Sequence, residues 1–90
     1  MADKRVYFAI ECMTQGLGYQ PGPELDFETA RKTWDAICAS LLAGKLYRRY
    51  RLVVCEQEGL KLNRQELQVC LPNKTPVTVG RSIHWGESER

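Results

Sequence analysis

Hydrophobic residues recur at helical spacing in the middle of the chain. They share one face of a helix with 3.6 residues per turn: Phe27, Ala30, Trp34, Ile37, Cys38, Leu41 and Leu42. Arg31 and Asp35 lie on the opposite face. Asp26 is suited to cap the free N–H groups of the first turn, and Gly44 can supply the left-handed residue that ends a helix. The pattern predicts an amphipathic helix over 27–43.

Side chains that repeat with a period of two predict strands on both sides of this helix. Alternation runs through 6–12 before the helix, through 47–56 after it, and through 77–85 near the C-terminus. In the second of these segments, Leu52 lies on one side and Val53 on the other. These segments predict three strands.

The stretch 63–71 fits two secondary structures. Leu67, Val69 and Leu71 alternate as in a strand. Asn63 followed by Glu66 instead resembles the capping box of a helix. We favour a strand, because 72–76, with a proline at each end, then becomes a hairpin connection to the last strand.

The order of elements predicts an α+β fold. Ninety residues make a single domain, 1–90. A strand, a helix and a further strand form a right-handed β-α-β crossover. The whole chain is then β-α-β-β-β, a mixed three- to four-stranded sheet with one amphipathic helix packed on one face. The segment 14–25 is expected to be a mobile loop, and about 86–90 a polar tail.

Composition excludes several classes of protein. The chain is 43% hydrophobic and 27% charged, which is typical of globular proteins and not of collagen-like, coiled-coil or disordered chains. No apolar stretch approaches the length of a membrane span, and the N-terminus lacks the features of a secretory signal, so we expect a cytoplasmic protein without a membrane partner.

The cysteines and the histidine do not indicate a cofactor. The four cysteines form no Cys-x-x-Cys pair and there is one histidine, so we expect neither a metal nor a cofactor. We expect the cysteines to be reduced and packed in the core. His84 alternates with Ile83 and Trp85, which points it away from the core if 77–85 is a strand. No cysteine is placed beside it, and we expect no enzyme activity.

Three short segments resemble a known pattern. Val6-Tyr7-Phe8, the helix start from Asp26 to Arg31, and Tyr50 to Val54 follow one another over about the first 56 residues. This order resembles small uncharacterised proteins of phages and mobile elements, without indicating a particular family. The resemblance implies a protein that modulates a host component.

A basic and aromatic run after the helix is the first candidate site. It consists of Lys45, Tyr47, Arg48, Arg49, Tyr50 and Arg51. Arginine and lysine can neutralise phosphates, and tyrosine rings can stack on unpaired bases, so the run suits single-stranded nucleic acid. Alternatively it is a solvated strand edge, where such charges prevent pairing with another sheet.

The second face of the sheet and the 14–25 segment form the other candidate site. One helix covers one face only, and the uncovered face is too apolar for a solvated surface, which indicates a protein partner or a twofold self-contact giving a homodimer. Gly16 and Gly18 do not continue into a phosphate-binding fingerprint. The expected partner-binding residues are Tyr7, Leu17, Tyr19, Arg49, Arg51 and Val53. The sequence thus predicts a non-enzymatic binding protein that masks or bridges a protein partner, with single-stranded nucleic-acid binding as the alternative.

Overall fold

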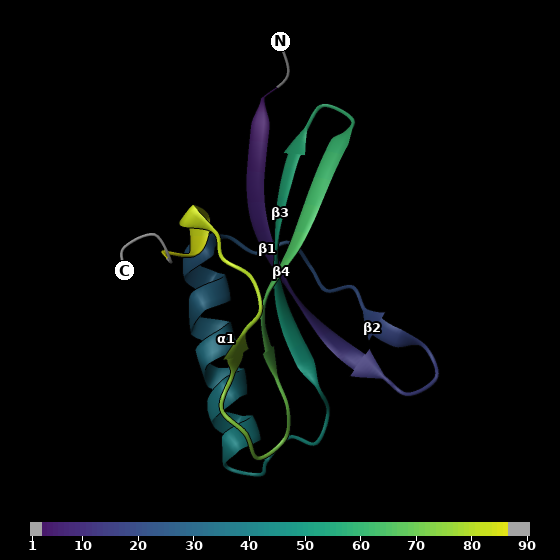
Figure 1. The fold of residues 1–90 in the computed structure, drawn as a ribbon, viewed down its shortest axis with the longest axis vertical. Helices are drawn as coiled ribbons and strands as arrows, with labels where there is room; N and C mark the ends of the chain where they lie inside the picture. Colours follow the sequence, from purple (N-terminus) through teal and green to yellow (C-terminus); the bar gives the residue numbers. More distant parts are fainter. Residues whose placement is uncertain (1–2, 87–90) are drawn as a thin grey trace.

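A single helix packs against one face of a strongly twisted, five-stranded sheet in the computed structural model, which describes residues 3–86 (Figure 1). The elements follow in the order β1 (Lys4–Thr14), β2 (Gly18–Gln20), α1 (Phe27–Leu42), β3 (Tyr50–Glu58), β4 (Lys61–Cys70), β5 (Val77–Thr78) and the 3-10 helix η1 (Ile83–Trp85). The strand order is β2-β1-β3-β4-β5. The α+β class and the single helix on one face are confirmed.

The sheet differs from the predicted one in its strand directions. All four strand pairings are antiparallel, so the mixed sheet and the parallel β-α-β crossover are wrong. The reason lies in the segment 14–25, which was expected to be a loop. It forms β2 against β1, and Leu25 then exchanges two 2.8 Å backbone hydrogen bonds with Phe8. The chain has therefore returned along β1 before α1 begins, and β3 enters the sheet antiparallel to β1.

Glycines allow this return. Gly16 and Gly18 have φ angles of 83° and 78°, the left-handed region needed in the tight turn between β1 and β2. Gly22 lies so close to β1 that an added Cβ would stand 2.3 Å from the carbonyl oxygen of Ile10. A larger residue at position 22 would push the segment off the edge of the sheet.

The helix has the predicted position. The Asp26 carboxylate accepts a 2.8 Å hydrogen bond from the Thr29 N–H, which lowers the pKa of Asp26 below its ordinary value of 3.8. At the other end, the Ala43 N–H donates to the Ala39 carbonyl at 3.0 Å, and the Lys45 N–H donates to the Ser40 carbonyl at 2.8 Å. The helix therefore ends one residue before the predicted end.

The core lies between α1 and the sheet. Its largest fully buried side chains are Trp34, Leu41, Leu52, Leu67 and Cys70. Trp34 also donates an Nε1–H hydrogen bond of 2.7 Å to the Gln68 side-chain oxygen, so its one polar atom is satisfied at the edge of the core.

The segment 61–70 is a strand, as favoured from its alternation. β3 and β4 are joined by a two-residue turn at Gly59 and Leu60, where Gly59 has a φ of 60°. The predicted final strand is wrong beyond Thr78, because the chain then leaves the sheet and folds back over the core as η1. Trp85 is buried there, with its ring 5.2 Å from that of Phe8. Of the expected polar tail, Gly86 ends η1 and 87–90 lie outside the described residues.

All four cysteines are free, and three of them are buried. Burial, with the neighbouring Cys70 thiol, raises the pKa of Cys38 to about 12, so this thiol stays protonated and unreactive at neutral pH. Within residues 3–86, the structure holds no helix with the length and apolar character required to cross a membrane.

Candidate functional site

The sheet face opposite α1 carries a small apolar cluster of Ala9, Val53 and Cys55, with Tyr7 packed against it. The antiparallel register places Tyr7 beside Cys55 and Ala9 beside Val53. Val53 is only 2% exposed, although no helix in the described part of the chain lies on this face. The cover therefore comes from longer side chains of the sheet and from the segment that follows β2. Val53 is a buried support and offers no surface to a partner.

A buried carboxylate lies next to this cluster. Glu11 is 3% exposed and pairs across the strands with Arg51, whose Nε lies 2.8 Å from Glu11 Oε1. Arg64, from β4, contacts the second carboxylate oxygen of Glu11. Arg51 also reaches Glu66, with 3.2 Å between Nη1 and Oε2. We call Glu11, Arg51, Arg64 and Glu66 the ionic cluster; its formal charges sum to zero.

The ionic cluster is tied to β2. The Arg51 guanidinium lies 4.1 Å from the centre of the Tyr19 ring, a cation–π contact. Burial opposes the charge on Arg51, but its hydrogen bonds to Glu11 and Glu66 outweigh that effect and raise its pKa. Arg51 is therefore charged and held from three sides.

Together these residues shape a groove of about 380 Å³ on the sheet face, which we call the sheet groove. The groove has an apolar side, a charged floor and a wall made by β2 and the chain that follows it. The apolar side consists of Tyr7, Ala9, Cys55 and Leu62. The charged floor consists of Glu11, Arg51 and Arg64. The wall consists of Tyr19, Pro21, Gly22 and Glu24. Burial, followed by the nearby Cys55 and Glu24, raises the pKa of Tyr7, so its hydroxyl stays neutral at physiological pH.

The structure brings together only some of the expected partner-binding residues. Tyr7, Tyr19 and Arg51 line the sheet groove. Leu17 lies outside it, 72% exposed in the turn between β1 and β2. Arg49 is exposed in the connection between α1 and β3.

Sequence reasoning missed Glu11, Leu62, Arg64 and Glu66. Glu11 offered a signal, because it is the one acidic residue in the alternating segment 6–12 and falls on the side of Tyr7 and Ala9. The other three lie on β4, and their part in the site depends on strand register.

The basic and aromatic run is divided between three environments. Lys45, Tyr47, Arg48 and Arg49 are exposed in the connection between α1 and β3. Tyr50 packs against the core, where burial and the neighbouring Cys12 raise its pKa. Arg51 belongs to the ionic cluster. The run therefore does not present its six residues to a ligand as one continuous surface.

Metal binding and histidine-based chemistry have little support among the described residues. Among residues 3–86, no three His, Cys, Asp or Glu side chains are grouped as metal ligands. His84, expected to point away from the core on a strand, instead lies in η1, with Nε2 2.8 Å from Glu56 Oε2. Comparison of the chain with protein-family models, with curated proteins and with solved structures finds no match.

Proposed function

We propose that this chain is a non-enzymatic, cytoplasmic binding protein that docks a protein partner in the sheet groove. The observation that carries the proposal is a preformed groove whose charged floor is already neutralised within the protein. A partner is then selected by shape and by apolar and hydrogen-bonding contacts, with no need for a compensating charge.

The residues that line the groove suit a protein interface. Tyrosine and arginine are enriched in the central parts of such interfaces, where tyrosine supplies a large contact area with few rotatable bonds. Tyr7 and Tyr19 are partly exposed, and the Arg64 side chain is 42% exposed. Leu62, on the apolar side, is 51% exposed. These four residues are accessible to a partner in the groove, together with the exposed Pro21 and Glu24 of its wall.

Internal contacts hold this surface in place before a partner arrives. Tyr19 is held by its contact with Arg51, and Arg64 by its ion pair with Glu11. Side chains that are already ordered lose less conformational entropy on binding. The arrangement favours an exposed segment of a partner protein that places an apolar side chain against Tyr7 and Leu62. The resemblance to phage and mobile-element proteins leads us to propose a host protein as this partner.

Site-specific photocrosslinking tests the proposal. A benzophenone amino acid is introduced at position 62 in the groove and, as a matched control, at position 79. Leu62 and Val79 are each 51% exposed, but Val79 lies beside β4 outside the groove. Each protein is irradiated in nuclease-treated lysate of the native host, and the adducts are identified by mass spectrometry.

A defined protein adduct from position 62 that is absent from position 79 supports the proposal. Leu62→Lys should then weaken binding of that purified protein, whereas Val79→Lys should leave it unchanged. Equal labelling from both positions, or none from position 62, contradicts it. Adducts between two copies of this chain would also overturn it, in favour of a homodimer.

A further inference from the structure

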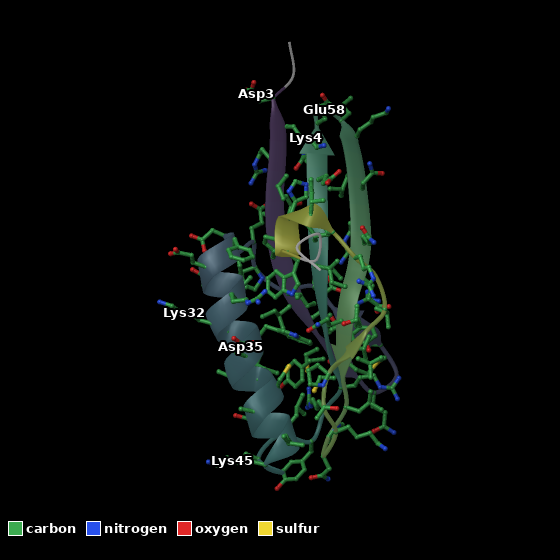
Figure 2. All side chains as sticks on the ribbon, turned by 60° about the vertical axis from the view of Figure 1, so that its left-hand side comes forward. Asp3, Lys4, Lys32, Asp35, Lys45 and Glu58 are labelled. Carbon is green, nitrogen blue, oxygen red and sulfur yellow. The ribbon has the colours of Figure 1, made fainter. Side chains whose placement is uncertain are left out.

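Within residues 3–86, one end of the molecule carries positive charge without acidic residues. The end of α1 with its connection to β3 and the β4–β5 connection lie there (Figure 1), and the end of β1 joins them through the hydrogen bond from the Met13 N–H to the Arg49 carbonyl. The corresponding stretches 12–23, 36–50 and 67–86 contain no Asp or Glu. Lys45, Arg48, Arg49 and Lys74 lie at this end, which we call the basic end, and all four are exposed. Figure 2 shows Lys45 at the foot of the helix, far from Lys4 and Glu58 at the opposite end.

These four charges are not used inside the protein. The ion pairs of the described residues involve Lys4, Arg5, Arg51, Arg64 and His84 as the basic partners. Within residues 3–86, Lys45, Arg48, Arg49 and Lys74 make no ion pair. The contrast with Arg51 is direct, because Arg51 is two residues from Arg49 and is held by two carboxylates.

The connection between α1 and β3, which presents Lys45, Arg48 and Arg49, is anchored at both ends. The Lys45 N–H donates to the Ser40 carbonyl, and the Met13 N–H donates to the Arg49 carbonyl, each at 2.8 Å. Leu46 packs against the core between these anchors. Tyr47 nevertheless points outward and is 80% exposed. An aromatic ring so exposed on an anchored segment contributes little to the core.

A hollow of about 500 Å³ opens beside this ring. Tyr47, Arg48 and Arg49 line one part of it, and Met13, Leu71 and Pro72 provide an apolar part. The negative end of the helix dipole also lies here, but carbonyls of the last turn of α1 accept backbone hydrogen bonds: Ser40 O from the Lys45 N–H at 2.8 Å, and Leu41 O from the N–H groups of Gly44 at 3.2 Å and Asn73 at 2.8 Å. The hollow thus combines a flat ring, an apolar surface and unpaired cations.

From this geometry we infer that the basic end binds single-stranded nucleic acid, with an unpaired base stacked on Tyr47 and phosphates bound by Arg48 and Arg49. Lys45 and Lys74 extend the path for the backbone. A single strand fits because its bases are free to stack, whereas duplex bases are stacked on one another. This site is separate from the sheet groove, so a protein using both would bridge a partner protein and a nucleic acid.

The charge count sets the expected salt dependence. Four cations that neutralise four phosphates of a single strand give a slope of about −3 for the logarithm of the binding constant against the logarithm of salt concentration. Binding should therefore weaken about 50-fold between 50 and 200 mM salt. Loss of one cation should reduce the slope by about 0.7. Loss of the Tyr47 ring should weaken binding about 5- to 150-fold and leave the slope unchanged.

Fluorescence anisotropy with a labelled twelve-nucleotide thymidine strand tests the inference, starting at low salt. We expect Arg48→Ala to reduce the slope, Tyr47→Ala to weaken binding at constant slope, and Tyr47→Phe to bind as the wild type does. Arg81→Ala is the matched control, because Arg81 is also exposed in an acid-free stretch but lies beside Gln65, away from the hollow.

The inference would be overturned by no binding at low salt, by equally tight binding of a duplex of the same length, or by Tyr47→Ala and Arg48→Ala variants that bind like the wild type. Displacement by polyglutamate as effective as by unlabelled oligonucleotide would also overturn it and indicate an acidic protein surface instead. Leu62→Lys should leave oligonucleotide binding unchanged, so the outcome here is independent of the proposed sheet groove.

Discussion

Replacing Glu11 by Gln tests whether the ionic cluster holds β1, β3 and β4 together on the groove side. The substitution keeps the shape of the side chain and removes its charge. Arg64 then loses its acidic partner, while Arg51 retains Glu66. Because Glu11 faces both arginines and is itself buried, this change should cost more stability than the removal of either arginine.

The expected loss of unfolding free energy depends on how exposed the two arginines that contact Glu11 are. Breaking a fully buried ion pair from one side costs about 3–5 kcal/mol. The side chains of Arg51 and Arg64 are 25% and 42% exposed, so water partly solvates them once Glu11 is neutral. We therefore expect Glu11→Gln to lower the free energy of unfolding by about 2–3 kcal/mol. For a domain of this size that corresponds to a fall in Tm of about 10–20 °C. Arg64→Leu should cost about 1 kcal/mol or less, because Glu11 keeps Arg51.

Urea unfolding followed by tryptophan fluorescence measures these differences, since Trp34 and Trp85 are both buried in the native state. Glu24→Gln is the matched control: Glu24 pairs with Arg5, but both side chains are more than half exposed. It should lie within about 0.5 kcal/mol of the wild type. The reasoning is refuted if Glu11→Gln is as stable as this control, or if Arg64→Leu is the more costly change.

Two further predictions concern the helix and its packing. Trp34→Ala should lower the unfolding free energy by about 3–5 kcal/mol. Trp34→Phe should lower it by about 1–2 kcal/mol, because this change removes chiefly the hydrogen bond to Gln68. Thermal unfolding followed by far-UV circular dichroism measures both changes, and a wild-type Tm for Trp34→Ala would contradict the packing of α1 on the sheet. The lowered pKa of Asp26 predicts a stabilising contribution that is fully present above its ordinary value of 3.8 and is lost as the pH falls through the lower pKa of the folded state. Asp26→Asn, which can still cap the helix, should lose less stability than the wild type between pH 5 and pH 2; equal acid sensitivity of the two proteins would argue against a contribution from the Asp26 charge.

The helix could be predicted from sequence because its signals are local. The apolar face, the Asp26 cap and the glycine after the last turn all lie within one segment, and the observed ends fall at Phe27 and Leu42. β4 could also be identified from the alternation of Leu67 and Val69, despite the competing capping pattern.

The sheet topology depends on a feature that the sequence shows only weakly. β2 has three residues and its turn is defined by positive φ angles at Gly16 and Gly18, so the alternation of side chains gave no strand there. If the chain did not run back along β1 before the helix, a strand on each side of the helix would form a parallel crossover, and this is what the sequence predicts. Similarly, the alternation in 77–85 is real, but the chain leaves the sheet after Thr78, and Trp85 finds its place in the core through a 3-10 turn instead.

The sequence predicts which face of the sheet carries the candidate site, but it does not predict which side chains contact one another there. The side assignment of Tyr7, Arg51 and Val53 was right, since alternation alone determines it. The contacts of Arg51 with Glu11 and Glu66 depend on register across three strands, which nothing in one sequence specifies. Arg51 therefore belongs to the interior network of the sheet face and not to the free basic surface expected from its neighbours.

The short outer strands determine how this sheet can associate. β2 has three residues and β5 two, and both flanking segments continue to hydrogen-bond the long inner strands, through Leu25 to Phe8 and through Val79 to Leu67. The outward edges of β1 at 4–7 and of β4 at 61–65 pair with no other strand in the described part of the chain, and the edge residues Lys4 and Lys61 repel an approaching copy. The short outer strands and these lysines consequently disfavour the edge-to-edge growth that leads to fibrils.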